Sequence, residues 1–171
     1  MFQQGELILY GNTGVCRIEA IGPRQGAVNV PLAERNKEYY TLSPLFGDGV
    51  IYAPLDTTVF MRPILTKEQA MELIHRIPQI QAEPFATRDQ RMLSEHYRGF
   101  FEKHNCEDLL QLICNIYVKG QNLAQCGKKV GSTDQQYLRR ATSLLHGELA
   151  AALGISIDEV EDFIAKEMEQ K

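Results

Sequence analysis

The spacing of the apolar residues changes at Pro63, and this change constrains the fold more than any other feature of the sequence. Before Pro63, short runs rich in Val, Ile, Tyr and Thr are separated by Gly, Asn and Pro, a pattern typical of β-strands. After it, apolar residues recur with the period of amphipathic helices. The chain is therefore predicted to have an α+β architecture, with a β domain followed by a helical one.

Several segments of the first 62 residues have the composition of strands. The turns between them include Gly11 and Asn12, which accept the positive φ of a tight hairpin. About five strands in so short a segment suit a small closed β-barrel, because closure leaves no long edge unpaired. The predicted strands are residues 6–10, 15–21, 26–30, 38–45, 50–53 and 58–61.

The helices predicted after Pro63 are marked by capping residues. Thr66 and Gln69 form a capping-box pattern before a first helix, which Pro78 ends. Four further short-looped segments predict a compact helical bundle. Their signals are Thr87 with Gln90, Asn105, Ser132 with Gln135 and a closing Gly154, and Ser156 with Glu159. We expect a β-barrel domain over residues 1–64, a connecting helix and linker over 65–83, and a helical domain over 84–171.

No motif in the sequence carries recognisable catalytic chemistry. The segment 127–133 contains Gly, Lys, Ser and Thr, but not in the order of a phosphate-binding loop. The four cysteines form no Cys-x-x-Cys pair, and His104, Cys106 and Cys114 lack a fourth metal ligand at a usual spacing. We therefore expect a protein that is not an enzyme and that holds neither a cofactor nor a metal.

The sequence also indicates where the protein resides. Its first residues lack a basic patch followed by an apolar run, and no stretch reaches the roughly 18 apolar residues of a membrane span. These observations favour a cytoplasmic protein with no membrane partner, and we expect it to be a monomer.

The charges are distributed unevenly along the chain. The formal net charge is −4 overall, but it is −2 over residues 1–83, +3 over 84–147 and −5 over 148–171. Positive residues gathered in one domain can neutralise phosphates and release counterions, which favours nucleic-acid binding. They can equally form an ordinary solvated face. The residues concerned are Arg88, Arg91, Arg98, Lys119, Lys128, Lys129, Arg139 and Arg140.

A second candidate site lies in the β domain. The run Val50-Ile51-Tyr52-Ala53-Pro54 is apolar and β-prone, and proline ends it. Such a run suits a buried core strand, and it also suits an edge strand offered to a partner. Both interpretations stay open on the sequence alone.

Residues in both domains together match the pattern of a known family. In the β domain they are Phe2, Gly5, residues 7–10, Gly14, Val15, Ile18, Ile21 and residues 39–42, 51–54 and 61–64. In the helical domain they are Tyr97, Arg98, Glu102, Lys103 and residues 144–150. In these residues the sequence resembles the CarD family of bacterial transcription factors, whose N-terminal module is shared with the transcription-repair coupling factor.

The resemblance implies a Tudor-like or SH3-like barrel that pairs its edge strand with the β subunit of RNA polymerase. It also implies a helical domain that contacts the minor groove at the upstream edge of the transcription bubble and changes open-complex stability. Arg24 matches a family position that contacts polymerase, and residues 50–54 match the edge strand. A nucleoid-associated location follows from this role.

This chain departs from the family pattern at three places. Tyr52 stands where some relatives carry an arginine, and Gln135 and Gln136 stand where basic residues are common. Relatives place a tryptophan wedge about one turn before the position of Tyr97, where this chain has Leu93 and contains no tryptophan. Leu93 is either a weaker wedge at the DNA or a core residue.

Two functions remain after this reasoning. The first is a transcription regulator that binds the polymerase β subunit through its barrel and promoter DNA through its helical domain. The second is an adaptor that binds polymerase or another protein without contacting DNA. The two differ in whether the basic residues of the helical domain gather on one surface.

Overall fold

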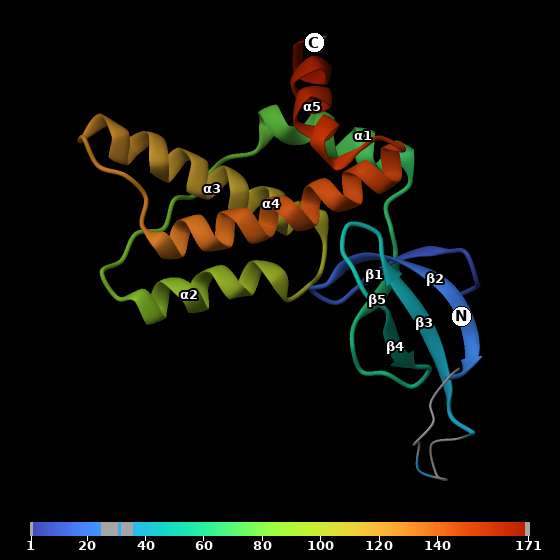
Figure 1. Cartoon of the computed structure of the whole chain (residues 1–171). Coiled ribbons are helices and arrows are strands. Elements are labelled where there is room, and N and C mark those ends of the chain that lie inside the picture. The colour runs from blue at the N-terminus through green and yellow to red at the C-terminus, as the bar shows by residue number, and fades with distance from the viewer. Residues whose placement is uncertain (1, 25–30, 32–35, 170–171) are drawn as a thin grey trace. The chain divides into compact units, whose positions relative to one another are not determined.

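The computed structural model describes residues 2–24, 31 and 36–169. Contacts divide the chain into two compact units, unit 1 with residues Met1–Ile64 and unit 2 with residues Leu65–Lys171. Figure 1 shows strands in the first and helices in the second. The strand predicted over residues 26–30 lies outside the described residues. Each unit is described by itself.

Unit 1 is a five-stranded antiparallel sheet with the strand order β4-β3-β2-β1-β5. Consecutive strands from β1 to β4 are neighbours, and β5 returns to pair with β1. The strands β4 and β5 therefore lie at the two ends of this order. The strands are β1 (Leu7–Tyr10), β2 (Gly14–Pro23), β3 (Glu38–Pro44), β4 (Ile51–Pro54) and β5 (Met61–Pro63).

Alternating side chains of these strands build the core of unit 1. Ile8, Ile18, Leu42 and Ala53 are fully buried and belong to one apolar cluster. On β2, for example, Arg17 and Glu19 on either side of Ile18 are exposed, as the two-residue period of a strand requires. The register of β2 against β3 shifts between Ile18 and Ala20, so the rest of β2 continues after a bulge.

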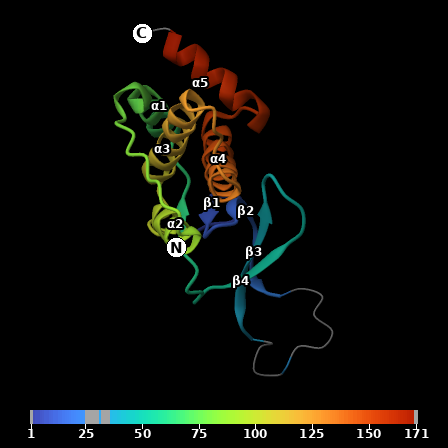
Figure 2. The same cartoon turned by 90° about the vertical axis from the view of Figure 1, so that its left-hand side faces the viewer.

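Unit 2 consists of helices, and Figures 1 and 2 show its two longest members, α3 and α4, side by side. This α+β architecture confirms the fold class predicted from the sequence. The helices are α1 (Lys67–Arg76), α2 (Gln90–Arg98), α3 (Cys106–Gln125), α4 (Ser132–Leu153) and α5 (Val160–Glu169), with short 3₁₀ turns η2 (Ile77–Gln79), η3 (Gly99–Phe101) and η4 (Ile157–Glu159).

Most of the predicted helix caps are confirmed. Thr66 and Gln69 form a capping box, Asn105 caps α3, Ser156 and Glu159 form a capping box, and Gly154 ends α4 with φ 71°. The caps predicted at Thr87 and Ser132 are wrong.

Asp89 caps α2, because its carboxylate accepts from the backbone N–H groups of Arg91 and Met92. Gly131 precedes α4, and its N–H donates to the Asp134 carboxylate (3.2 Å). In both places an acidic side chain in or next to the first turn replaces the predicted hydroxyl.

Helix α1 and the segment after it are packed into unit 2. Helix α1 contacts α4 and α5, and Leu73 belongs to the same apolar cluster as Tyr97 and Leu145. The segment after η2 is held by hydrogen bonds, from Gln111 to the Gln81 carbonyl (2.8 Å) and from the Glu83 N–H to Asn115 (2.7 Å). Residues 65–83 therefore belong to the folded body of unit 2. Within the described residues, no helix is long and apolar enough to cross a membrane.

Candidate functional sites

The first candidate site is strand β4, which has a single neighbour among the described residues. It pairs with β3 alone, from Leu42 opposite Ile51 to Tyr39 opposite Pro54. Ala53 is fully buried in the core of unit 1, and Ile51 packs against that core. The run 50–54 therefore has both properties considered from the sequence, because it contributes to the core with one face and also lies at the end of the sheet.

The backbone groups of β4 that point away from β3 can be identified from the register. The Leu55 N–H donates to the Glu38 carbonyl (3.2 Å). Antiparallel pairs alternate between hydrogen-bonded and non-hydrogen-bonded positions. Ala53 and Ile51 consequently bond to β3, whereas the N–H and C=O of Tyr52 point away from it. Pro54 has no N–H, so it limits the length of the edge.

Arg24, which follows β2, contacts the side chain of Tyr52 on β4. The Arg24 guanidinium lies over the Tyr52 ring, with its central carbon 4.6 Å from the ring centroid. This cation–π contact holds a flexible, charged side chain at the Tyr52 ring. The two residues are 28 positions apart in the sequence, and the fold brings them together. Val50, just before β4, is 55% exposed.

The second candidate site is the side of unit 2 formed by α2 and α4. The Thr133 hydroxyl donates to Gln90 (2.8 Å), which joins the beginnings of these two helices. Just after α2 ends, the Phe101 ring lies beneath the guanidinium of Arg140, two turns further along α4, with the central carbon 4.7 Å from the ring centroid. The helices therefore run side by side in the same direction.

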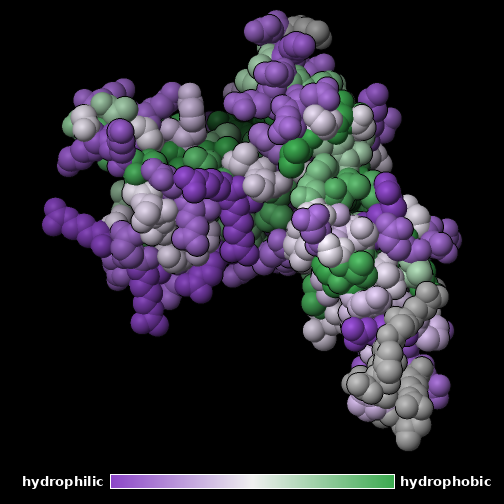
Figure 3. All heavy atoms as spheres, viewed as in Figure 1, coloured by the Kyte–Doolittle hydropathy of each residue, from purple (hydrophilic) through white to green (hydrophobic). Residues whose placement is uncertain are grey.

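The basic residues of this region are largely exposed. Arg88, Arg91 and Arg98 are exposed on or just before α2, and Figure 3 shows hydrophilic side chains projecting there. Arg91 forms an ion pair with Glu95 (3.5 Å), both side chains being mostly in solvent. Such a pair contributes little to stability and opens easily. Of the other basic residues singled out from the sequence, Lys128 and Lys129 before α4 and Arg139 and Arg140 on it are also exposed.

Lys119 does not share this exposure. Its ammonium group contacts the Asp134 carboxylate at 2.9 Å, and the Lys119 side chain is 11% exposed. Asp134 also accepts from the Tyr97 hydroxyl. Lys119 is therefore held as part of a buried network that joins α2, α3 and α4, so its assignment to DNA contact is corrected to a structural role.

Leu93 is a core residue in this structure. It is 3% exposed and belongs to the cluster that includes Tyr97 and Phe101. A side chain must be accessible to wedge into a base step, and Leu93 is covered. Of the two interpretations left open by the sequence, burial supports the core residue and removes Leu93 from the candidate DNA-facing surface.

An aromatic cluster beside α2 was not predicted from the sequence. The His96 ring stacks on Phe85, with centroids 4.0 Å apart, and meets Phe100 edge to face. Burial lowers the pKa of His96. On the neighbouring side Tyr137 contacts Tyr97 and Phe101. The cluster fixes the segment before α2, and no local sequence pattern could have revealed it because its members come from three segments.

Glu148 is another residue that the sequence analysis did not single out as functional. Its carboxylate is buried on α4, where it accepts from the Leu65 N–H (2.9 Å) and contacts the Cys106 thiol (3.2 Å). It thus fixes the first residue of unit 2. Burial of an acidic group requires such partners.

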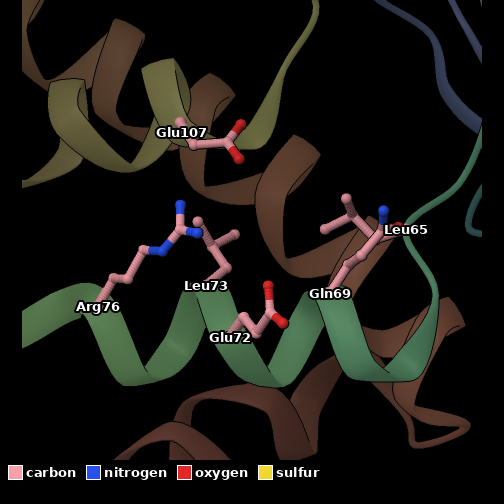
Figure 4. Close-up of a pocket in the computed structure, with 6 residues that line it drawn as sticks. All are labelled: Leu65, Gln69, Glu72, Leu73, Arg76 and Glu107. Carbon is pink, nitrogen blue, oxygen red and sulfur yellow. The ribbon is translucent and has the colours of Figure 1, made fainter.

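A small polar pocket of about 150 Å³ lies next to this point, between α1 and the beginning of α3. Figure 4 shows Arg76, Glu72 and Glu107 around it. Its size suits several water molecules better than an organic ligand. No group of His, Cys, Asp and Glu side chains able to hold a metal occurs in the part of the chain that the structure describes.

Unit 1 thus has a strand edge without a neighbour among the described residues, and unit 2 has exposed basic residues on and near α2 and α4. Residues 2–65 match the family of CarD-like/TRCF RID domains. Unit 1 therefore matches the CarD-like/TRCF RID domains and has a Tudor-like fold, which confirms the resemblance that the sequence shows in its β domain.

This match indicates RNA polymerase interaction in transcription regulation. CarD-like proteins are transcription factors without catalytic activity. No curated protein matches the chain.

Proposed function

We propose that this protein binds the β subunit of RNA polymerase through the β4 edge and promoter DNA, near the upstream edge of the bubble, through unit 2. By holding both, it changes the lifetime of the open promoter complex. The observation that carries the proposal is the β4 edge with Arg24 stacked on Tyr52, because it occurs in a domain of the RID family.

The polymerase contact is proposed to have two parts. The outward N–H and C=O of Tyr52 accept an added strand, a mode of binding in which main-chain hydrogen bonds supply affinity. The Arg24 guanidinium then meets an acidic or carbonyl group of the partner. Tyr52 keeps the guanidinium in place by stacking, so it substitutes in this chain for the second arginine of some relatives.

The DNA contact is proposed to use the exposed basic residues on and near α2 and α4. Their positive charge is modest, and a domain with few phosphate contacts binds weakly at physiological salt. Tethering removes this difficulty, because a unit bound to polymerase raises the effective concentration of the other unit at the promoter. The residues are Arg88, Arg91, Arg98, Lys128, Lys129, Arg139 and Arg140.

The polymerase contact is tested with two variants and a matched control. Tyr52→Pro removes the outward N–H without removing a hydrogen bond to β3, and Arg24→Glu reverses the charge. Arg17→Glu makes the same charge change at an exposed position within β2. In a pull-down of the β subunit, the first two variants are expected to bind at least tenfold more weakly and the control to bind normally. Normal binding by a folded Tyr52→Pro variant would refute the proposed edge.

The DNA contact is tested by changing Arg139 and Arg140 together to glutamine. Loss of two phosphate contacts should shorten open-complex lifetime and reduce the log–log salt slope by up to about two units. The control changes Lys67 and Lys166, which are exposed on α1 and α5, to glutamine. An unchanged slope in the first variant would favour the adaptor function, in which unit 2 contacts protein.

A further inference from the structure

Unit 2 contains an apolar groove that the proposed polymerase and DNA contacts do not use. It lies between α3 and α4, with the segment after α1 and helix α5 at its rim, and its volume is about 540 Å³. This volume is within the range of sites that hold drug-sized molecules. Figure 3 shows hydrophobic side chains in the hollow between α3 and α5.

The surface of the groove is mainly hydrocarbon. Leu110 and Leu145 belong to the buried core beneath it, and Ile113, Leu138 and Ile164 line it from three helices. Tyr117, also in the lining, is 63% exposed. When an apolar ligand displaces water from a concavity of this kind, the free energy of the system falls.

A few polar groups converge on the same groove. Thr142 and His146 lie one turn apart on α4, and Glu161 lies on α5. Within the described part of the chain, the structure gives none of these three side chains a hydrogen bond or an ion pair. Burial lowers the pKa of His146, and the charge of Glu161 partly opposes this effect.

The charge of the groove is therefore negative at neutral pH. Glu161 is the one Asp, Glu, Lys or Arg residue among the described residues that line it. An occupant that carries a positive group would compensate this charge, whereas an anionic occupant would be repelled by it.

We propose that the groove binds an apolar small molecule that carries one protonated amine, with its hydrocarbon body against α3 and α4 and its amine at Glu161. The site is independent of the proposed polymerase and DNA contacts.

The test uses three probes that share one phenylbutyl body and differ in the head group: 4-phenylbutylamine, 4-phenylbutanol and 5-phenylvalerate. Each is titrated into the full chain while the methyl signals of Ile113, Leu138 and Ile164 are followed by NMR. The amine is expected to shift these signals with a Kd in the millimolar range or tighter. The alcohol should bind about fivefold more weakly, and the carboxylate more weakly still.

Variants of the protein test which side chains cause the expected preference for the amine probe. Glu161→Gln should reduce amine binding to the level of the alcohol, whereas Asp162→Asn, an exposed acid beside it that does not line the groove, should change nothing. Ile113→Ala should weaken all three probes. The proposal is overturned if no probe shifts the methyl signals, if the carboxylate binds best, or if Glu161→Gln keeps the amine preference. It is also overturned if the signals shift with protein concentration alone, because a second copy would then occupy the groove.

Discussion

The buried network around Asp134 offers the sharpest test of how unit 2 is held together. Its carboxylate accepts from the Lys119 ammonium, the Tyr97 hydroxyl and the Gly131 N–H, and these groups come from α2, α3 and the beginning of α4. Asp134 is 3% exposed. Burial and the bond to Asp134 also raise the pKa of Tyr97, so the phenol stays protonated and continues to donate.

The proposed perturbation is Asp134→Asn, which keeps the shape of the side chain and removes its charge. Lys119 would then be a nearly buried cation without its anion. Breaking a buried ion pair by removing one partner costs about 3–5 kcal/mol, far more than the loss of a single neutral hydrogen bond at about 1 kcal/mol. Lys119→Met in the same chain removes the stranded charge, so the double variant should recover much of the loss.

The assay is urea unfolding followed by circular dichroism at 222 nm, because the helices of the described chain all belong to unit 2. With a slope of about 2 kcal/mol/M, the single variant should lower the midpoint by about 2 M. Asp158→Asn, at an exposed acid, should stay within about 0.5 kcal/mol of the wild type. A midpoint shift below about 0.5 M for Asp134→Asn, or no recovery in the double variant, would refute this account of the network.

Three further predictions follow from burial in each unit. Leu93→Trp should overpack the core, so it should destabilise unit 2 by about 1–3 kcal/mol and lower its melting temperature, without lengthening open-complex lifetime. A longer open-complex lifetime at unchanged stability would restore the interpretation of Leu93 as a wedge at the DNA. Cys16 is fully buried, and burial raises its pKa to about 11. A thiol reagent at pH 8 should therefore label the exposed Cys126 rapidly and Cys16 only as unit 1 unfolds. Equally fast labelling of Cys16 in a Cys126→Ser variant would contradict the burial of Cys16. Because burial lowers the pKa of His96, the unfolded chain takes up its proton first as pH falls below about 6.5, so unit 2 should lose stability between pH 7 and 5, and His96→Phe should reduce the loss as measured by urea midpoints.

The sequence predicted those parts of the fold that depend on neighbouring residues. Thr66 and Gln69 are three positions apart, and Gly154 directly follows its helix, so their capping roles are visible in a short window. The caps of α2 and α4 were misplaced because two kinds of capping residue stand close together there. The energies that decide between Thr87 and Asp89 differ by only a fraction of a kcal/mol.

The candidate sites were less predictable, because they depend on contacts between distant residues. Lys119 has the same charge as Lys128, and only its partner Asp134 on another helix distinguishes it. Leu93 fits both a helix core and an exposed wedge until packing covers it. Arg24 meets Tyr52 only because β2 and β4 flank the same strand.

The β4 edge also affects how the protein behaves before it meets a partner. An unpaired strand end is a template on which a second copy can add, the first step toward aggregation. Here the edge is four residues long, and Pro54 lacks the donor that would extend it. Two copies joined symmetrically along β4 would also bring their Arg24 side chains toward the same strand pair, where like charges repel. The short length of β4 and the missing donor at Pro54 thus limit the main-chain hydrogen bonds that a second copy could add.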